Sequence, residues 1–231
     1  MKEIPLSEIS NSLEEAITQS DLKDVSIDLA ELSIDNLLDD GIIKDIPFLR
    51  TLVGISQTAS NIQNRLFLKK ILAFLSEINQ IPQKERELMI AKIDSSDEYK
   101  IKVGEKILYI VDKADDHQIT RILGVLFSAF IKGKITYDEF TQSTTIINGV
   151  FIKDLINFVN ENGHHSSLEK AGPLLNSGLY IIEIDPIEVD VEESDDHEDR
   201  NKYSTDVSGG ELSAMVSEIG RKIRDVLKGK V

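Results

Sequence analysis

Short stretches of the chain carry residue types that bind metal ions, but each one lacks part of the required set. Residues 133–140, GKITYDEF, match the second half of a calcium-binding EF-hand loop. The first half would need acidic ligands, and its positions are held by Ser128, Phe130 and Lys132. We therefore interpret the stretch as a helix stop at Gly133, followed by a capping box in which Thr136 precedes the next helix and Glu139 lies three residues on.

Histidine occurs in two places where a metal site would need further ligands. His164 and His165 follow Gly163, and adjacent side chains point apart, with no second ligand three or four residues away. The pair is therefore predicted to lie in a turn. His197 is surrounded by the acidic residues Asp195, Asp196, Glu198 and Asp199. Nothing in that cluster sets a coordination geometry, so we interpret it as a solvated loop and predict no metal and no cofactor.

The sequence shows no pattern of catalytic residues. The chain has no cysteine, which excludes disulfides, a thiol nucleophile and cysteine metal sites. A nucleophile elbow, a phosphate-binding glycine loop and a dinucleotide fingerprint are also missing. Carboxylates are plentiful, but most occur in blocks of charge that are typical of exposed surface. We expect a protein that is not an enzyme and has no catalytic residue.

The net charge of −15 is unevenly placed along the chain. Residues 1–43 carry eleven acidic and two basic residues, and residues 183–201 carry ten acidic residues and one basic residue. The segment 44–81 sums to +3 and the last thirty residues to +2. Nucleic-acid binding needs cations that neutralise phosphates, so the charge pattern favours a protein partner over nucleic acid.

Two charged clusters are the candidate contact surfaces. Arg65, Lys69 and Lys70 share one face of a predicted helix and fit an acidic partner or an anionic membrane surface. The alternatives are a solvated face, or cations that pair with the acidic N-terminal helices. The second cluster is the acidic loop, which would select a partner by its charge. The candidate partner-contact residues are Arg65, Lys69, Lys70, Asp195, Asp196, Glu198 and Asp199.

Apolar spacing predicts a helical body over residues 1–133. Expected capping residues are Ser10 or Ser12, Ser95 or Ser96, and Asp115 or Asp116, and Pro82 is expected to open a helix. The segment 46–64 contains a single charge, Arg50, which suits a helix that is covered on both sides. Helices are predicted over 7–19, 26–40, 45–64, 64–79, 82–93, 97–114 and 117–133.

Residues 134–231 are predicted to form a separate, smaller module. Two more helices over 136–151 and 152–163 are followed by a short helix that Ser166 or Ser167 caps. Alternation then predicts strands over 179–184 and 187–191, on either side of Pro186. The acidic segment 192–210 is predicted to be a mobile loop, and 212–227 a closing amphipathic helix. The predicted fold class is mainly α: a helical bundle followed by a small α+β module with an acidic β-hairpin or loop.

Two motifs of this module resemble a winged-helix domain over about 135–231. They are the helix-to-strand step LLNSGLYIIE and the final helix SEIGRKIRDVL. The resemblance implies a recognition helix at 166–177 and a wing at the acidic loop. The charges depart from the family pattern, because the helix offers Lys170 alone and the wing is acidic, whereas groove reading needs Arg, Lys, Asn or Gln. We therefore expect such a module to contact protein.

The segments DGIIKDIP and FLKKILAFL resemble uncharacterised bacterial helical proteins over roughly 35–160, some of them encoded at phage-defence (abortive-infection) loci. The resemblance carries no catalytic motif and implies a role in bacterial stress or phage defence. The N-terminus lacks the apolar core of a signal peptide, and no run of 18 apolar residues occurs. A cytoplasmic location is therefore expected.

The predicted function is that of a non-enzymatic protein-interaction component. Three alternatives stay open at this point. They are a membrane-perturbing effector that uses the charge-poor helix 46–64, an acidic mimic of DNA, and a winged-helix transcription regulator. The sequence leaves the partner and the oligomeric state undetermined.

Overall fold

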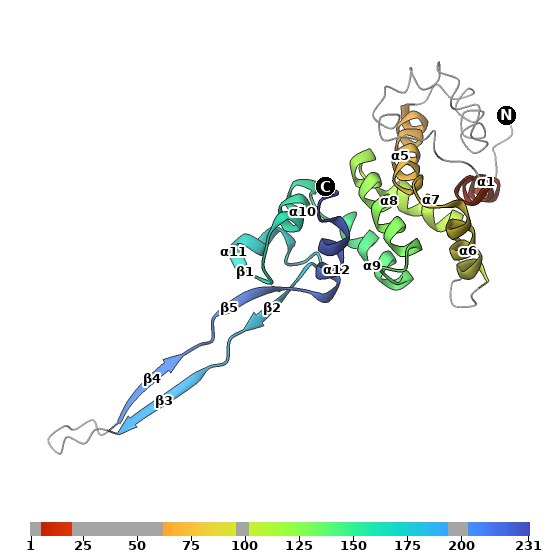
Figure 1. The fold of residues 1–231 in the computed structure, drawn as a ribbon. Coiled ribbons are helices and arrows are strands. Elements are labelled where there is room, and N and C mark those ends of the chain that lie inside the picture. The colour runs from red at the N-terminus through yellow and green to blue at the C-terminus, as the bar shows by residue number, and fades with distance from the viewer. Residues whose placement is uncertain (1–5, 20–61, 96–101, 194–202) are drawn as a thin grey trace.

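The computed structural model describes residues 6–19, 62–95, 102–193 and 203–231 (Figure 1). The predicted helix 26–40 and residues 46–61 of the charge-poor helix lie outside this part. So do the acidic residues 195–199. The described residues confirm the predicted fold class: the chain is mainly helical, with a small antiparallel β region near the C-terminus.

Helix α8 is the central element of the helical body. It is apolar around most of its circumference, and all its residues from Ile122 to Ile131 are buried. Helix α5 runs beside it, and α6 and α7 pack around the pair. The N-terminal helix α1 packs on α6 and α7. The described helices of the body are α1 (Leu6–Gln19), α5 (Ile62–Ile78), α6 (Gln83–Asp94), α7 (Val103–Lys113) and α8 (His117–Ile131).

The core is organised around the ring of Phe127 on α8. Its centroid lies 5.4 Å from that of Phe74 on α5 and 5.4 Å from that of Phe140. One turn earlier on α8, Gly124 lets the two helices approach closely. A Cβ at that position would lie 2.8 Å from the carbonyl oxygen of Phe74 and 2.9 Å from the Cβ of Glu77.

Several predicted helix ends are confirmed. The carboxylate of Asp116 accepts hydrogen bonds from the backbone N–H of Gln118 and Ile119. Thr136 and Glu139 form the expected capping box at the start of α9 (Tyr137–Ile147). Pro82 is the N-cap of α6. The caps at Asp116 and Thr136 satisfy N–H groups that have no partner within their own helix, whereas Pro82 makes no side-chain cap hydrogen bond.

Other predicted caps are wrong. Helix α1 begins at Leu6, so Ser10 lies inside it and is buried against α7, close to Gly104. Ser95 is the C-cap of α6, where its hydroxyl donates to the carbonyl oxygen of Lys92, and the N-cap of the next helix is Lys102. Helix α7 begins only at Val103, six residues later than predicted.

The C-terminal module joins helices to a three-stranded sheet and a protruding hairpin (Figure 1). The sheet order is β1-β5-β2, with both pairings antiparallel, and β3 pairs with β4 in a separate two-stranded hairpin. After α9, its elements are α10 (Ile152–Asn160), β1 (His165–Ser167), α11 (Leu168–Ala171), a 3₁₀ turn η3 (Gly172–Leu174), β2 (Tyr180–Ile184), β3 (Glu188–Glu193), β4 (Tyr203–Ser208), β5 (Leu212–Val216) and α12 (Glu218–Leu227).

Three predictions for this module are wrong. The closing helix starts at Glu218, after the N-cap Ser217, because residues 212–216 form strand β5 and pair on both edges. Strand β4 occupies part of the segment 192–210 that was predicted to be a mobile loop. His165 lies in strand β1 and not in a turn.

Helix α12 returns to the body and packs against α8, α9 and α10. Its apolar side chains Ile219, Ile223 and Leu227 are buried. The ammonium group of Lys222 lies 3.6 Å from the carboxylate of Glu139 on α9. The division into 1–133 and 134–231 stays a prediction, and both α9 and α12 pack against α8 across this boundary.

Replacing Gly124 by alanine should destabilise the fold. The added methyl group would press on the backbone of α5, and overpacking of this kind costs about 1–3 kcal/mol. Urea denaturation measures the free energy of unfolding. Gly149→Ala is the matched control, because a Cβ there meets only ordinary contacts at 3.6 Å. Equal stability of the two variants would contradict the close approach of α5 and α8.

The capping carboxylate of Glu139 should make stability depend on pH. The backbone N–H of Thr136 and then the ammonium group of Lys222 hold the pKa of Glu139 below its ordinary value of 4.5. Its contribution is therefore fully present above pH 4.5 and is lost as pH falls through the folded-state pKa. Glu139→Gln should lower the free energy of unfolding at pH 7, and the gap from the native chain should close in acid. A gap that is constant from pH 7 to pH 3 would contradict this.

Candidate functional site

Among the elements that the structure describes, the hairpin of strands β3 and β4 is exposed along its length, and we call it the arm. It extends from the C-terminal module away from the helical body (Figure 1). Its backbone register pairs Val189 with Val207 and Asp190 with Asp206. All of its side chains that the structure describes are exposed, and no other described element covers either face.

The two faces of the arm differ in chemistry. Residues that are directly opposite in an antiparallel pair share a face, and successive residues alternate between faces. The apolar face therefore carries Val189, Val191 and Val207, which are 58%, 58% and 62% exposed. The acidic face carries Glu188, Asp190, Glu192 and Asp206. Valine is normally among the most buried residues, so a strip of exposed valines marks a contact surface.

A bend connects the arm to the three-stranded sheet. The two segments that connect the sheet to the arm stay hydrogen-bonded to each other through the bend. The backbone N–H of Asp185 donates to the carbonyl oxygen of Glu211 at 2.9 Å, and that of Gly210 donates to the carbonyl oxygen of Asp185 at 3.1 Å. Gly209 has a φ of +83°, and a Cβ there would collide with the carbonyl oxygen of Pro186. The bend therefore requires glycine at this position.

The sheet that carries the arm is fixed to α10 and α12 through the ring of Phe158. The Arg224 guanidinium lies 4.3 Å from the centre of this ring, and the ring of Tyr180 on β2 meets it edge-on at 5.3 Å. Arg224 also donates to the carbonyl oxygen of Gly163 at 2.5 Å. These contacts give the arm a rigid base.

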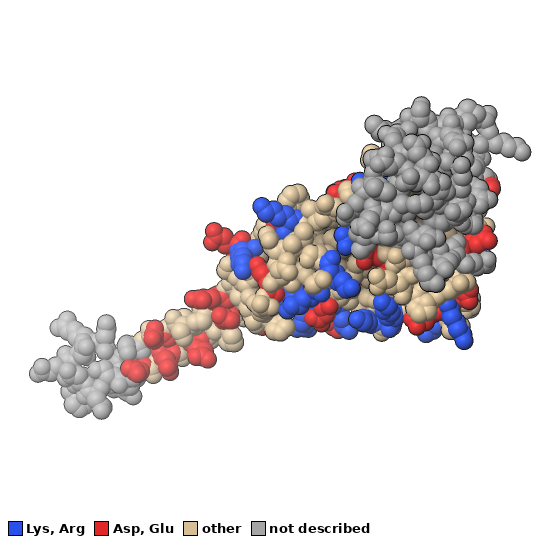
Figure 2. Space-filling model, turned by 45° about the horizontal axis from the view of Figure 1, so that its top comes forward, with Lys and Arg blue, Asp and Glu red and all other residues tan. Residues whose placement is uncertain are grey.

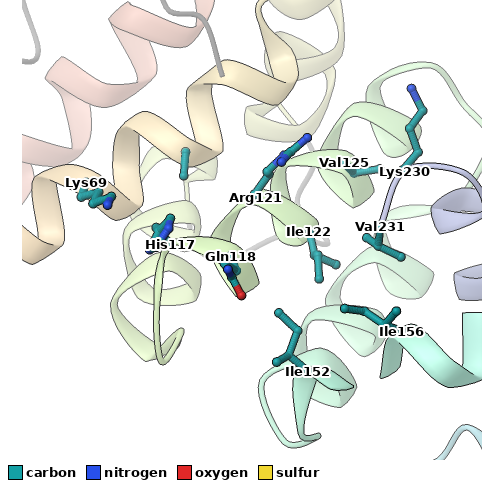
Figure 3. Close-up of a pocket in the computed structure, with 11 residues that line it drawn as sticks. Lys69, His117, Gln118, Arg121, Ile122, Val125, Ile152, Ile156, Lys230 and Val231 are labelled. Atoms are coloured by element: carbon teal, nitrogen blue, oxygen red, sulfur yellow. The ribbon is translucent and has the colours of Figure 1, made fainter. Parts of the chain in front are cut away.

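A groove with basic edges runs along α8 on the body. It consists of two adjoining hollows of about 360 Å³ and 290 Å³, which share Arg121, Val125 and Lys230. In the larger one, Ile122, Ile152 and Ile156 converge on an apolar floor (Figure 3). We call this the basic groove, and its cationic residues are Lys69, Arg121, Lys132, Lys134 and Lys230.

The cations of the basic groove outnumber its acidic residues. Glu77 lines it and forms an ion pair with Arg121 at 2.6 Å. Among the described residues, no carboxylate lies within ion-pair distance of the other four cations, Lys69, Lys132, Lys134 and Lys230. The groove is therefore electropositive, although the chain as a whole carries −15.

The structure separates the predicted contact residues. Lys69 lines the basic groove, whereas the ammonium group of Lys70 donates to the Asp112 carbonyl oxygen at 3.3 Å. Arg65 belongs to α5, and its side chain is outside the described part. The acidic residues Asp195, Asp196, Glu198 and Asp199 also lie outside it, between the two strands of the arm.

Sequence reasoning predicted an acidic β-hairpin or loop in this module, but it missed the exposed faces of the arm and most of the basic groove. The alternation in IEVDV identified β3, but the exposure of both faces is seen only in the structure, where no other described element covers them. Lys132, Lys134 and Lys230 are distant from Lys69 in sequence, so no motif joins them. The described residues contain no cluster of three His, Asp or Glu that could hold a metal ion.

A partly buried carboxylate pair lies away from both surfaces. Burial and then the neighbouring carboxylate of Asp94 raise the pKa of Glu14 on α1. Asp94 accepts a hydrogen bond from the backbone N–H of Val103, at the start of α7. The pair joins α1 to the start of α7, and it lines neither hollow of the basic groove, so we assign it a structural role.

Comparison of the chain with protein-family models, curated proteins and solved structures finds no match. The resemblances to winged-helix domains and to bacterial phage-defence proteins therefore stay predictions. No helix in the described part of the chain has the length and apolar content needed to cross a membrane. The arm and the basic groove are thus defined by geometry and charge alone.

Substituting Gly209 should release the arm from its fixed direction. Gly209→Ala adds a collision with Pro186 to the cost of a positive φ. Amide hydrogen exchange in β3 and β4 should accelerate, while exchange in α8 should not change. Gly229→Ala is the control, because Gly229 also has a positive φ but faces open space. Unchanged exchange in the arm would show that the bend does not depend on this glycine.

Proposed function

We propose that this protein is a non-enzymatic interaction component, and that the arm is the element that contacts its protein partner. The observation that carries the proposal is the arm itself, a hairpin with an exposed strip of valines on one face and carboxylates on the other. The partner surface would be basic and would offer apolar side chains. The helical body would serve as the platform that holds the arm.

The energetics of the arm support a bound state. A two-stranded hairpin on its own is marginally stable in water. Here Asp190 faces Asp206 directly, and like charges in opposite positions destabilise a strand pair. Cations from a partner would relieve this repulsion, and burial of the valines would contribute further stabilisation.

The order of elements in the module supports a winged-helix-like arrangement that is used for protein contact. Along the chain, the module has a helix, a short strand, a further short helix, and two strands that flank a hairpin. This order and the sheet order β1-β5-β2 agree with the resemblance seen in the sequence. The position of the recognition helix holds only α11, of four residues, and η3. Its Lys170 pairs with Glu161 at 2.9 Å. The acidic wing and the short helix both favour a protein as the binding partner over DNA.

One alternative, a DNA mimic, draws support from the acidic face. Glu188, Asp190 and Glu192 alternate along β3, so these carboxylates project from one face roughly 7 Å apart. Their regular placement on a strand suits a protein that normally binds a phosphate backbone. Release of a captured partner by duplex DNA would favour this version of the contact.

The biological setting rests on resemblance alone. We propose a cytoplasmic role in a bacterium, in stress or phage defence, as the sequence suggested. The charge-poor helix 46–64, which motivated a membrane-perturbing effector, lies for the most part outside the described residues. That alternative would be supported by leakage of anionic lipid vesicles.

Photo-crosslinking from the arm tests the proposal. A photoreactive p-benzoylphenylalanine replaces Val189, and the protein is irradiated in lysate of its source cells at low salt. Crosslinks to one or a few defined proteins should form severalfold more strongly than from Leu88. That control position is 64% exposed on α6, far from the arm in sequence.

Competition with the chain that lacks the photoreactive residue tests whether the crosslinks are specific. Native chain should suppress the crosslinks, and the acidic-face variant Asp190→Lys/Asp206→Lys should suppress them much less. If position 189 crosslinks no more than position 88, the arm is not a contact element and the proposal fails.

A further inference from the structure

We infer that the basic groove binds the arm of a second copy of this chain. The inference rests on the proposed role of the arm as a protein-contact element and names its partner. It follows from charge, from apolar surface and from the direction in which the arm extends.

The two surfaces carry opposite charge. Residues 181–193 and 203–212, which build the arm and its base, include eight acidic residues and no lysine or arginine. The basic groove has five cations, and Arg121 is the one that pairs with Glu77. Figure 2 shows acidic and no basic residues along the described part of the arm, whereas lysines and arginines occur on the body, with acidic residues between them. The chain thus provides both halves of a complementary charge pair, which favours fast and specific association.

The apolar surfaces also match in kind. The larger hollow of the groove has isoleucines on its floor, with Ile152 and Ile156 half-buried. The arm and its base expose valines and isoleucines, including Ile184 and Ile187 at 63% and 67%. Contact between these side chains would remove from water the large apolar groups that the single copy leaves exposed.

Association must occur between copies. The arm extends away from its own body, whereas the basic groove lies on that body along α8 (Figure 1). An arm therefore reaches the groove of a neighbour and not its own. Each copy has one arm and one groove, so the contact either closes as a reciprocal pair or continues as a chain of copies.

Charge reversal on each surface tests the inference. Light scattering after size-exclusion chromatography at 50 mM NaCl should show a mass above that of one chain, and 500 mM NaCl should reduce it because salt screens surface charges. Asp190→Lys/Asp206→Lys on the arm and Lys132→Glu/Lys230→Glu in the groove should each weaken association by roughly tenfold or more. The arm variant retains a like-charge pair across β3 and β4, so the repulsion within the hairpin stays.

Combining the two reversals in one chain should restore association, because the surfaces become complementary again with opposite signs. Lys84→Glu/Lys106→Glu is the control: these residues lie on α6 and α7, and they line neither hollow of the groove. It should associate like the native chain. Circular dichroism and thermal unfolding of every variant check that the fold is kept.

The outcomes separate this inference from the proposed function. A native chain that stays monomeric at every concentration overturns the second-copy contact, and so does association that is insensitive to all the reversals. If the probe at position 189 then crosslinks a different protein, the proposed function stands and only the identity of the partner changes. If the probe crosslinks nothing and the chain is monomeric, both proposals fail.

Discussion

The direction of the arm depends on the backbone hydrogen bonds of strand β5. This strand pairs with β1 on one edge and with β2 on the other, so its N–H and C=O groups are satisfied on both sides. The chain enters it from β4 and leaves it for α12, which is buried against the body. Because β5 is fixed at both edges, the two strands that continue outward must leave the sheet together. The ring of Phe158, between Arg224 and Tyr180, holds this sheet on the helices.

The helical body provides the stiffness that an exposed arm needs. Packing around Phe127 and the close approach at Gly124 leave α5 and α8 little freedom to shift. Helix α12 joins this core to the module through its apolar side. An arm that is held by a rigid body has less conformational freedom to lose, so less conformational entropy is lost when it binds a partner.

Charges of opposite sign lie on two separate surfaces of the molecule. Lysines from α5, from the end of α8 and from the C-terminus meet at the basic groove, while acidic residues of β3 and β4 meet on one face of the arm. Because acidic residues are in excess over the whole chain, the net charge does not reveal the electropositive surface. Such segregation favours a directed contact between unlike surfaces, and the net negative charge maintains solubility.

The sequence by itself determined the helices and most of their ends. Apolar spacing placed α6, α8 and α9, and the caps at Asp116 and Thr136 act locally, so neighbouring residues suffice to predict them. The alternation of IEVDV likewise identified β3 as a strand. Local patterns were insufficient at Leu212–Val216, where a sequence compatible with a helix pairs with β1 and β2.

Only the tertiary structure decided which surfaces stay open. Whether Val189 is buried depends on whether another element covers it, and that is a property of the whole fold. The basic groove likewise depends on packing: Lys69 lines one of its hollows, Lys132 and Lys134 line the other, and Lys230 lines both. The physical reason is the range of the forces involved: capping and periodicity act within one or two turns, whereas strand pairing, burial and the summed electric field depend on residues that are distant in sequence.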